Sequence, residues 1–381
     1  MTFPAAALRD AAATWGTPLY VTDLDVASSA AERWSRAVPG ALIAYAVKAN
    51  PDPALLTRLA ADGIGAEVVG PVELELALRA GIEPDRIVVN GAGQTDHDLR
   101  AALATGALVN AESLDALRAL LSAEGGGRIG LRLNPGLDAK THPHLATGSA
   151  GSKFGIAMDE LPNALDLLQA ASVRPASVGG HIGSAIDDPW PFGRLAALLR
   201  PIADDLGAEH IDLGGGFTGD PERWAADVLP QAGDAARLIV EPGRTIVRDA
   251  GWLLTRVVRV QARGQLIADA GMTELLRPML YGALHPVTLL EHGDALPHDG
   301  PWTLSGPICE AGDVLVGSVE LGRGAGAGAL LAIGEAGAYG AAMASNYNGR
   351  LRPAQVVLEG GVARLSRRRE SLADLVGRDA G

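Results

Sequence analysis

The sequence predicts an α/β plus β protein, in which a (β/α)8 TIM barrel is joined to a second domain rich in β structure. Between residues 41 and 241, eight short apolar runs alternate with longer stretches whose apolar residues recur three and four positions apart. Alternation of short buried strands with amphipathic helices is the repeat of such a barrel. A barrel of this kind takes about 200 to 250 residues. Because the chain has 381 residues, a second domain is expected.

The eight predicted strands are short and rich in apolar and β-branched residues. They are Ala41 to Val47, Ile64 to Val69, Arg86 to Val89, Ala107 to Val109, Arg128 to Leu133, Ala176 to Gly180, His210 to Leu213 and Arg237 to Val240. The segments between them have the spacing of amphipathic helices. Clear examples are Pro53 to Ala61, Pro71 to Ala80, Thr95 to Ala104 and Pro191 to Leu206.

The second domain is predicted to be discontinuous. After Arg248 the chain changes to β-like runs separated by glycine-rich turns, which indicates an antiparallel β-barrel or sandwich. These runs are Trp252 to Ala262, Trp302 to Leu304, Asp313 to Leu321 and Gln355 to Ser366. The strand-like segment Pro18 to Thr22 precedes the barrel and is expected to join them. We therefore assign residues 25–250 to the barrel, and residues 1–24 with 251–381 to the β domain.

Composition excludes several classes of partner. A net charge of -13 without any lysine or arginine run argues against nucleic acid and anionic membranes, which need a basic surface. Cys309 is the single cysteine, which excludes an internal disulfide and fits a reducing cytoplasm. The first residues have no basic region followed by an apolar stretch, and no window of eighteen apolar residues occurs. The eight histidines show no metal-ligand spacing, so no metal site is expected.

Polar residues or glycine follow the predicted barrel strands almost without exception. They are Lys48, Glu67, Asn90, Asn110, Asn134, His181, Gly214 and Glu241. The carboxyl ends of barrel strands form one rim, so these residues would converge on a single site. For any one of them, a structural role at the end of a strand is an equally good interpretation. Eight together favour a site.

Lys48 is the most informative of these residues, because the chain has three lysines against twenty-nine arginines. Guanidinium stays charged and cannot condense with an aldehyde, whereas a partly desolvated amine can. The alternative is a solvated cation that happens to end a strand.

A glycine triplet, Gly214 to Gly216, follows the seventh strand. Such a loop lets backbone N–H groups approach a phosphate, although a tight turn also needs glycine. An amine, a phosphate loop and the acid Glu241 together match pyridoxal 5'-phosphate, whose ring nitrogen needs an acidic partner. His181 could lie against the ring, or it could be a buried histidine of the core.

Six separated motifs carry a family resemblance from about Pro18 to Val357. They are Tyr45-Ala-Val-Lys-Ala-Asn50, His181-Ile-Gly-Ser184, Gly214-Gly-Gly216, Glu241-Pro-Gly-Arg244, Gly306-Pro-Ile-Cys-Glu310 with Asp313, and Gly337-Ala-Tyr-Gly340. In order and spacing they resemble the alanine-racemase-like, fold type III pyridoxal phosphate decarboxylases. The segments around Asp269, Arg277 and Asn346 resemble the diaminopimelate decarboxylase branch of that family.

The resemblance implies a role for each matching residue. Lys48 would bind the cofactor covalently, Glu241 would hold its ring nitrogen, and His181 would stack on the ring. Further cofactor contacts would come from Glu67, Ser184, Gly215, Gly216, Gly243, Arg244 and Tyr339. Substrate contacts would come from Arg244, Arg277, Tyr281, Glu310 and Tyr339. Cys309 would act as the catalytic acid. The resemblance also implies a homodimer, in which Cys309 and Glu310 reach the partner's site.

The resemblance further implies conversion of meso-2,6-diaminopimelate to L-lysine and carbon dioxide. The sequence departs from that branch at Gln94, Ala185, Thr273 and Ala311, which would lie on the substrate side. Decarboxylation of another D-configured, basic or conjugated amino acid is therefore the alternative. A racemase is less favoured, because it needs a second base and Cys309 is a poor base beside Glu310. A non-catalytic cofactor carrier is less favoured, because it would not need the Cys309 domain and the chain keeps Lys48.

Overall fold

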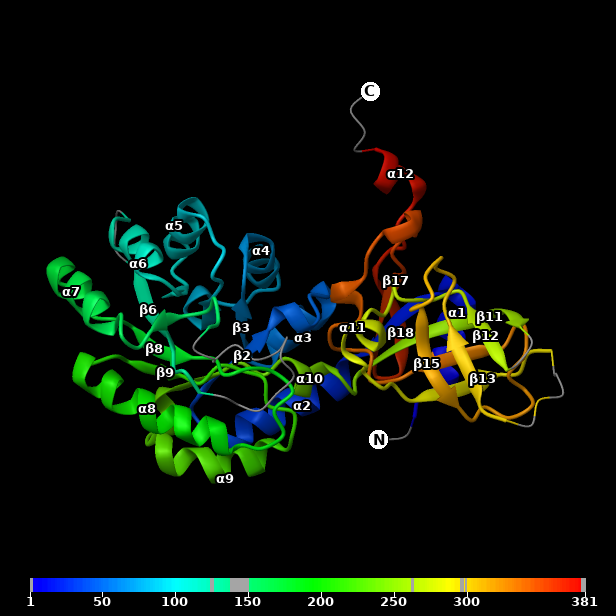
Figure 1. Ribbon diagram of the computed structural model, residues 1–381, viewed down its shortest axis with the longest axis horizontal. Helices are drawn as coiled ribbons and strands as arrows, with labels where there is room; N and C mark the ends of the chain where they lie inside the picture. The colour runs from blue at the N-terminus through cyan, green and yellow to red at the C-terminus, as the bar shows by residue number, and fades with distance from the viewer. Residues whose placement is uncertain are drawn as a thin grey trace. The chain divides into compact units, whose positions relative to one another are not determined.

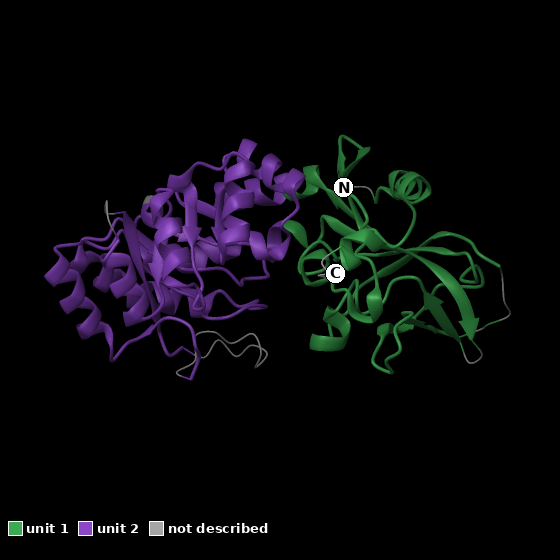
Figure 2. Ribbon diagram, turned by 90° about the horizontal axis from the view of Figure 1, so that it is seen from above, with its two compact units in different colours: residues 1–27, 247–381 green, residues 28–246 purple. Residues whose placement is uncertain are grey.

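The computed structural model describes residues 3–123, 127–137, 151–261, 264–294, 298 and 300–377. The chain folds into two compact units (Figure 2). Unit 1 contains residues 1–27 and 247–381, and unit 2 contains residues 28–246. The barrel limits expected from the sequence, residues 25 and 250, differ from those of unit 2 by three and four residues. No helix in the described ranges is both long and apolar enough to cross a membrane.

Unit 2 is a closed barrel of eight parallel strands, which confirms the predicted (β/α)8 fold (Figure 1). The strands are β2 (Leu42–Ala46), β3 (Gly65–Val68), β4 (Ile87–Val89), β5 (Leu108–Ala111), β6 (Arg128–Asn134), β8 (Ser177–Gly180), β9 (His210–Asp212) and β10 (Leu238–Val240). β10 pairs with β2 and closes the barrel. A short strand that the sequence did not predict, β7 (Ile156–Ala157), adds to β6 alone.

A helix follows each barrel strand, and Figure 1 shows these helices outside the barrel. They are α3 (Pro53–Ala61), α4 (Pro71–Arg79), α5 (Asp96–Ala104), α6 (Leu114–Leu121), α7 (Leu161–Ala171), α8 (Trp190–Leu206), α9 (Pro221–Ala232) and the single turn α10 (Arg244–Val247), with α2 (Leu24–Ala37) before β2. Local chemistry sets their starts. Asp52 accepts hydrogen bonds from Ala54 N and Leu55 N at α3, and Thr95 forms a capping box with Asp98 at α5.

The strand register determines which residues face the barrel interior, because paired residues of parallel strands share a face. Ala44, Val88, Leu108 and Ile239 form an apolar cluster there. In β2 and β3, Ala44 pairs with Gly65, and Ala46 pairs with Glu67 two residues closer to the carboxyl ends of the strands. Asn110, Arg132 and Asp212 lie on this same inward face, since they pair through Gly130, Ser177 and Gly179. The inward face of the strands therefore carries both the apolar cluster and these polar and charged side chains.

Unit 1 contains the β domain. Its strands are β1 (Leu19–Asp23), β11 (Gly251–Gln261), β12 (Gln265–Ala268), β13 (Val287–Glu291), β14 (Trp302–Ser305), β15 (Val314–Val319), β16 (Leu330–Ile333), β17 (Ala354–Glu359) and β18 (Val362–Arg367). The order is β15-β14-β12-β11-β1-β17-β18, and β16 pairs with β11 and β13. The helices are α1 (Ala5–Trp15), α11 (Arg277–Tyr281) and α12 (Leu372–Val376).

The predicted β domain is confirmed and most of its strand pairs are antiparallel, but the sheet as a whole is mixed. β1 is antiparallel to β11 and parallel to β17, and β12 is parallel to β14. A strand inserted between two oppositely directed neighbours must run parallel to one of them. β1 is buried on both faces, with Leu19 and Val21 in one apolar cluster and Tyr20 in the other. This double burial explains its uninterrupted apolar run.

Four aromatic rings pack against one another beside the barrel. Trp224 of α9 lies edge-on to Trp34 of α2 at 5.6 Å and to Phe192 of α8 at 6.0 Å between ring centroids. Phe217, directly after the glycine triplet, contacts Phe192 at 6.0 Å and Trp34 at 6.3 Å. The glycine loop is thereby attached through one side chain to two helices, α2 and α8.

Replacing Trp224 by alanine should therefore lower the free energy of unfolding of unit 2 by about 3–5 kcal/mol, since it empties a closely packed site. Urea denaturation followed by circular dichroism measures this. Trp190→Ala is the matched control, because Trp190 lies on α8 with 62% of its surface exposed. Equal losses in the two variants would contradict the assignment of Trp224 to the core.

Candidate active site

The polar rim predicted from the strand ends is held together by hydrogen bonds. Lys48 lies in the 3-10 turn Val47–Ala49 directly after β2, and its Nζ forms an ion pair with Glu67 Oε2 from the end of β3. The Glu67 side chain is 1% exposed, whereas that of Lys48 is 34% exposed. The amine thus lies between a buried carboxylate and solvent. Such a position suits a group that must both hold a charge and meet a small molecule.

Glu241 is connected to the same group through two asparagines. Asn90 Nδ2 donates to Glu241 Oε1 at 2.7 Å and lies 3.3 Å from Glu67 Oε1. Asn110 Nδ2 donates to Asn90 Oδ1 at 2.9 Å and lies 3.4 Å from Asp212 Oδ2. One buried chain of amides and carboxylates therefore runs through Glu67, Asn90, Glu241, Asn110 and Asp212.

Burial shifts the protonation of this chain. Desolvation, reinforced by the charges of Asp212 and Glu67, raises the pKa of Glu241 well above its usual range, and Lys48 and Arg132 oppose the shift. Desolvation also raises the pKa of Asp212 to about 6, although Gly214 N and Glu241 donate to it and lower it. A carboxyl that donates to a second carboxyl carries the proton. The geometry therefore favours a protonated Glu241 beside Asp212.

The loops after β8, β9 and β10 meet through their backbones, and this requires glycine. A Cβ on Gly215 would collide with the carbonyl oxygen of Glu241. Gly216 has φ +101°, and a Cβ there would collide with the carbonyl oxygen of Gly183. Gly243 packs against Ala46 and Ala49, on either side of Lys48, with its Cβ position 3.0 Å from both methyls. Side chains at these positions would push the three loops apart.

Two further predicted residues lie close together on these loops. Arg244 Nη2 is 3.3 Å from Ser184 Oγ, which joins the start of α10 to the loop after β8. At the other end of that loop, His181 Nδ1 accepts from Gly183 N at 3.3 Å. Desolvation, together with the positive charges of Arg132 and Lys48, lowers the pKa of His181 well below its usual value. His181 is therefore a neutral ring, which suits stacking.

The predicted residues of the β domain all lie in unit 1. Cys309 and Glu310 are exposed on the loop between β14 and β15. Asp313 anchors this loop: its carboxylate accepts from Ile308 N at 2.7 Å and from Met272 N at 2.6 Å. Tyr347 OH donates to Glu310 Oε1 at 2.6 Å and orients that carboxylate. The loop that carries the exposed pair is thus anchored by Asp313, and the Glu310 carboxylate is oriented by an exposed tyrosine.

Arg277 and Tyr281 begin and end the short helix α11, and both are half-buried. Tyr339 lies on the turn after β16 with φ 57°, a left-handed conformation that is uncommon outside glycine. The neighbouring Gly337 has no room for a Cβ beside the Val247 carbonyl. This turn therefore has a tightly specified backbone.

Sequence reasoning missed two residues of the barrel interior, Arg132 and Asp212. Arg132 Nη1 forms an ion pair of 2.8 Å with Glu112, which is 2% exposed, and its charge also acts on His181 and Glu241. Both residues stand inside strands that read as apolar. The signal that could have identified them is a charged residue at an inward position of a strand. Arg132, for example, lies two residues after Gly130 and therefore on the same face of β6.

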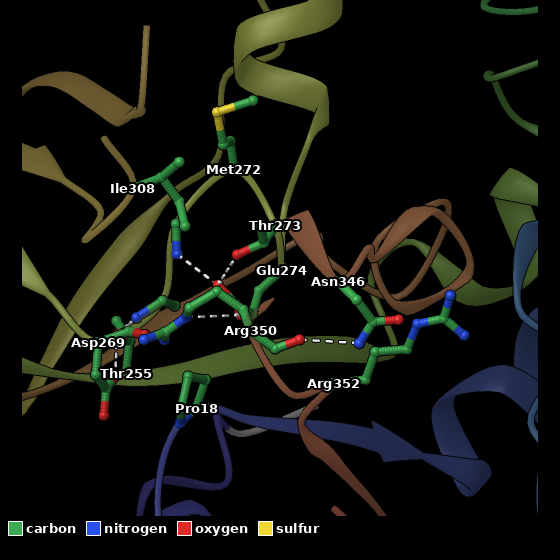
Figure 3. Close-up of polar contacts among 12 residues, drawn as sticks. Pro18, Thr255, Asp269, Met272, Thr273, Glu274, Ile308, Asn346, Arg350 and Arg352 are labelled. Atoms are coloured by element: carbon green, nitrogen blue, oxygen red, sulfur yellow. Dashed lines mark hydrogen bonds and ion pairs between the residues drawn. The ribbon is translucent and has the colours of Figure 1, made fainter. Parts of the chain in front are cut away.

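The four departures from the family pattern fall in different environments. Thr273 is 1% exposed and donates to Glu274 Oε2 at 2.9 Å, in the buried cluster that Figure 3 shows beside Arg350. Gln94 donates to Asn90 O at 2.6 Å, next to the Glu241 chain. Ala185 is exposed with φ 60°, and Ala311 is exposed beside Glu310. Thr273 is therefore buried within unit 1, and its expected place on the substrate side stays a prediction.

Comparison with known proteins gives consistent matches along the chain. Residues 24–248 match the family described as pyridoxal-dependent decarboxylase, pyridoxal binding domain. The chain is 41% identical over 377 residues to the diaminopimelate decarboxylase of Deinococcus radiodurans, with 97% of both proteins covered. It is 37% identical over 391 residues to that of Aquifex aeolicus, with 96% of this chain and 92% of the relative covered.

Solved structures give the same result. The diaminopimelate decarboxylase of Helicobacter pylori complexed with L-lysine superposes with a TM-score of 0.91 at 33% identity, covering 97% of this chain and 98% of that one. A lysine/ornithine decarboxylase of Vibrio vulnificus complexed with cadaverine has a TM-score of 0.81 at 22% identity, which shows a common fold alone.

The buried carboxyls predict a pH dependence of stability. Because the pKa of Asp212 is raised to about 6, the folded protein holds a proton that the unfolded chain releases near pH 4. Stability of the cofactor-free protein should therefore fall as the pH rises from about 4 to 6. In Asp212→Asn this fall should be smaller, because Asn keeps the acceptor for Gly214 N and does not ionise. Thermal denaturation between pH 4 and 8 measures how stability changes with pH in the wild-type protein and in Asp212→Asn. Asp227→Asn, at an exposed position, is the control. The same pH dependence in all three proteins would contradict the raised pKa of Asp212.

Proposed function

Because the chain belongs to the pyridoxal-dependent decarboxylase family, we propose that it converts meso-2,6-diaminopimelate to L-lysine and carbon dioxide. It is a pyridoxal 5'-phosphate-dependent amino-acid decarboxylase. The substrate assignment rests on one observation above others, the similarity over nearly the whole chain to diaminopimelate decarboxylases of several species. The β domain is included in that similarity, and it carries the residues proposed to meet the substrate.

The barrel residues fit the cofactor. An amine that is half open to solvent can condense with an aldehyde, and Lys48 has that environment. A pyridine nitrogen needs a nearby acid, and Glu241 is buried with a raised pKa and lies next to the Lys48–Glu67 pair. Ser184, Arg244 and the glycine loop supply hydroxyl, guanidinium and backbone donors for a phosphate.

Pyridoxal phosphate, when bound, supplies an aldehyde for an amine and a ring that withdraws electrons from the bond that breaks. We assign the other tasks to side chains. Glu67 holds the Lys48 ammonium at the rim, and Glu241, oriented by Asn90, would share its proton with the ring nitrogen of the bound cofactor. The neutral His181 would lie against the ring, where it would add no charge that opposes protonation of that nitrogen.

The substrate would be held by cations and an acid. Arg244, Arg277 and Tyr281 would bind carboxylate, and Glu310, oriented by Tyr347, would bind the distal ammonium. Cys309 would return a proton to the carbon that loses carbon dioxide. Tyr339 would contact cofactor and substrate. Cys309 and Glu310 would come from the second subunit of a homodimer, as the family resemblance implies. The single cysteine is consistent with a cytoplasmic enzyme.

A different diamino acid is the second candidate. It is motivated by Ala185 and Ala311, two exposed alanines that replace polar residues beside Ser184 and Glu310. A lost polar group in a recognition loop changes which side chain is accepted. The same chemistry would then act on another basic or D-configured amino acid.

Carbon dioxide release should occur with diaminopimelate and be at least about 10³-fold lower in Lys48→Ala. Lysine, ornithine and arginine complete the panel of substrates.

Wild-type protein should also gain a visible absorption band with pyridoxal phosphate, and borohydride should fix the cofactor on Lys48. The Lys48→Ala variant should show neither the absorption band nor the fixed cofactor. Turnover of another amino acid without turnover of diaminopimelate would favour the second candidate. Exchange of the α-hydrogen without carbon dioxide release would indicate a racemase.

Shared sites predict complementation between two inactive variants. Lys48→Ala and Cys309→Ala should each be nearly inactive alone. After mixing and subunit exchange, each heterodimer would contain one complete site, so about a quarter of wild-type activity should return. Absence of recovery, despite heterodimers seen by native mass spectrometry, would show that Cys309 serves the site of its own chain.

A further inference from the structure

His285 occupies a buried position between two segments that carry proposed substrate contacts. Its side chain is 5% exposed. One ring nitrogen, Nδ1, lies 3.0 Å from the carbonyl oxygen of Gly334, at the end of β16. The other, Nε2, lies 3.3 Å from Nη1 of Arg277, the first residue of α11. The imidazole therefore connects α11 to the end of β16.

These partners leave one arrangement of protons on the ring. A carbonyl oxygen can only accept a hydrogen bond, and a guanidinium can only donate one. Nδ1 must therefore carry the hydrogen and donate to Gly334, while the lone pair of Nε2 accepts from Arg277. A doubly protonated ring would direct an N–H at the guanidinium. The contacts thus specify a neutral imidazole with its hydrogen on Nδ1.

The backbone around Gly334, to which His285 Nδ1 bonds, is also fixed by hydrogen bonds. Gly334 N donates to the carbonyl of Pro286 at 2.8 Å, so residues 285 and 286 both bond to Gly334. Ile333, immediately before, pairs with Val287 across β16 and β13. Gly334 also begins the turn that leads to Tyr339, where Glu335 and Tyr339 both have positive φ. His285 is thus attached to a backbone that has little freedom to move.

An arginine binds a carboxylate more tightly when a neighbouring side chain already holds its guanidinium in place. Its side chain has many rotamers, and ordering them opposes binding unless the protein has already fixed the guanidinium. A bond at Nη1 restrains the plane of the guanidinium and directs its remaining N–H groups. A lysine at this position could not present the same planar fork.

We infer that His285 is a positioning residue that holds Arg277 in the orientation needed to bind the carboxylate that the substrate keeps after decarboxylation. This inference rests on the proposed function, and it adds a residue that neither the motifs nor the strand-end pattern identified. His285 does not itself touch the substrate in this scheme. Its effect is on substrate affinity, through Arg277.

Two substitutions separate the bonds of His285. His285→Gln places an amide oxygen near the Nε2 position, so it keeps an acceptor for Arg277 and loses the Gly334 bond. His285→Asn places an amide nitrogen near the Nδ1 position, so it keeps the Gly334 bond and loses Arg277. For the asparagine variant we expect KM for diaminopimelate to rise about 10-fold with kcat changed less than about twofold, as for loss of one hydrogen bond to a charged group. The glutamine variant should stay closer to wild type. His292→Gln, at an exposed histidine of the same unit, is the control.

Inhibition by the product lysine and by its analogue without a carboxylate tests the carboxylate contact directly. L-Lysine carries one carboxylate and 1,5-diaminopentane carries none, so His285→Asn should weaken inhibition by lysine about 10-fold and leave that by the diamine unchanged. In an Arg277→Lys background, the same substitution should have little further effect, because the bond it removes is already lost. Equal weakening of both inhibitors, or full additivity with Arg277→Lys, would overturn the inference and leave His285 as a packing residue.

The ring state can be read without any substrate. Nitrogen-15 NMR of the holoenzyme should show a neutral His285 with its hydrogen on Nδ1, assigned by the signal that His285→Gln removes. A hydrogen on Nε2, or a doubly protonated ring at pH 7, would overturn the inference even if the enzyme is active. Conversely, a protein that releases no carbon dioxide from diaminopimelate but shows the Nδ1 hydrogen and the Arg277 coupling in lysine binding would disprove the proposed substrate and keep the role of His285.

Discussion

The ion pair between Lys48 and Glu67 is the contact on which the barrel rim depends. Glu67 is 1% exposed and shares the interior with Asp212 and Glu241, so a set of buried carboxyls of the same charge must be balanced. Lys48 supplies a positive charge at one end of this set and Arg132, paired with Glu112, supplies another. The charge that remains is relieved by protonation of Glu241. One ion pair thus fixes the position of the amine, and its two charges act in opposite directions on Glu241: Glu67 raises the pKa of that acid and Lys48 lowers it.

Backbone geometry makes this balance possible. The strand register places Glu67, Asn110, Arg132 and Asp212 on the same inward face as the apolar cluster. The loops after β8, β9 and β10 approach one another so closely that Gly215 and Gly216 admit no side chain. Phe217 then attaches the glycine loop to the aromatic cluster of α2, α8 and α9. A polar site is therefore supported by an apolar exterior layer.

Unit 1 fixes its proposed site residues by buried side-chain contacts and not by strand register, since these residues lie on loops and a short helix. Asp313 pins the Cys309 loop through two backbone N–H groups, and His285 joins Arg277 to the end of β16. Glu274 accepts from Gly271 N and from Thr273 and lies 3.8 Å from Arg350 (Figure 3). Buried carboxylates and one imidazole replace the strand register as the means of fixing exposed groups.

By itself the sequence determined the eight barrel strands and their helices, and it singled out Lys48 as the candidate reactive amine, because periodicity and residue type carry local information on burial and reactivity. The tertiary structure decided which polar groups meet. Asn90 and Glu241 are 151 residues apart, and Arg132 and Asp212 stand in strands that look apolar until the register turns them inward. The mixed direction of the second sheet was likewise invisible, since a strand's pattern is the same whichever way it runs. Hydrogen-bond partners, strand direction and shared protons are properties of pairs brought together by folding, and a pattern along one chain does not contain them.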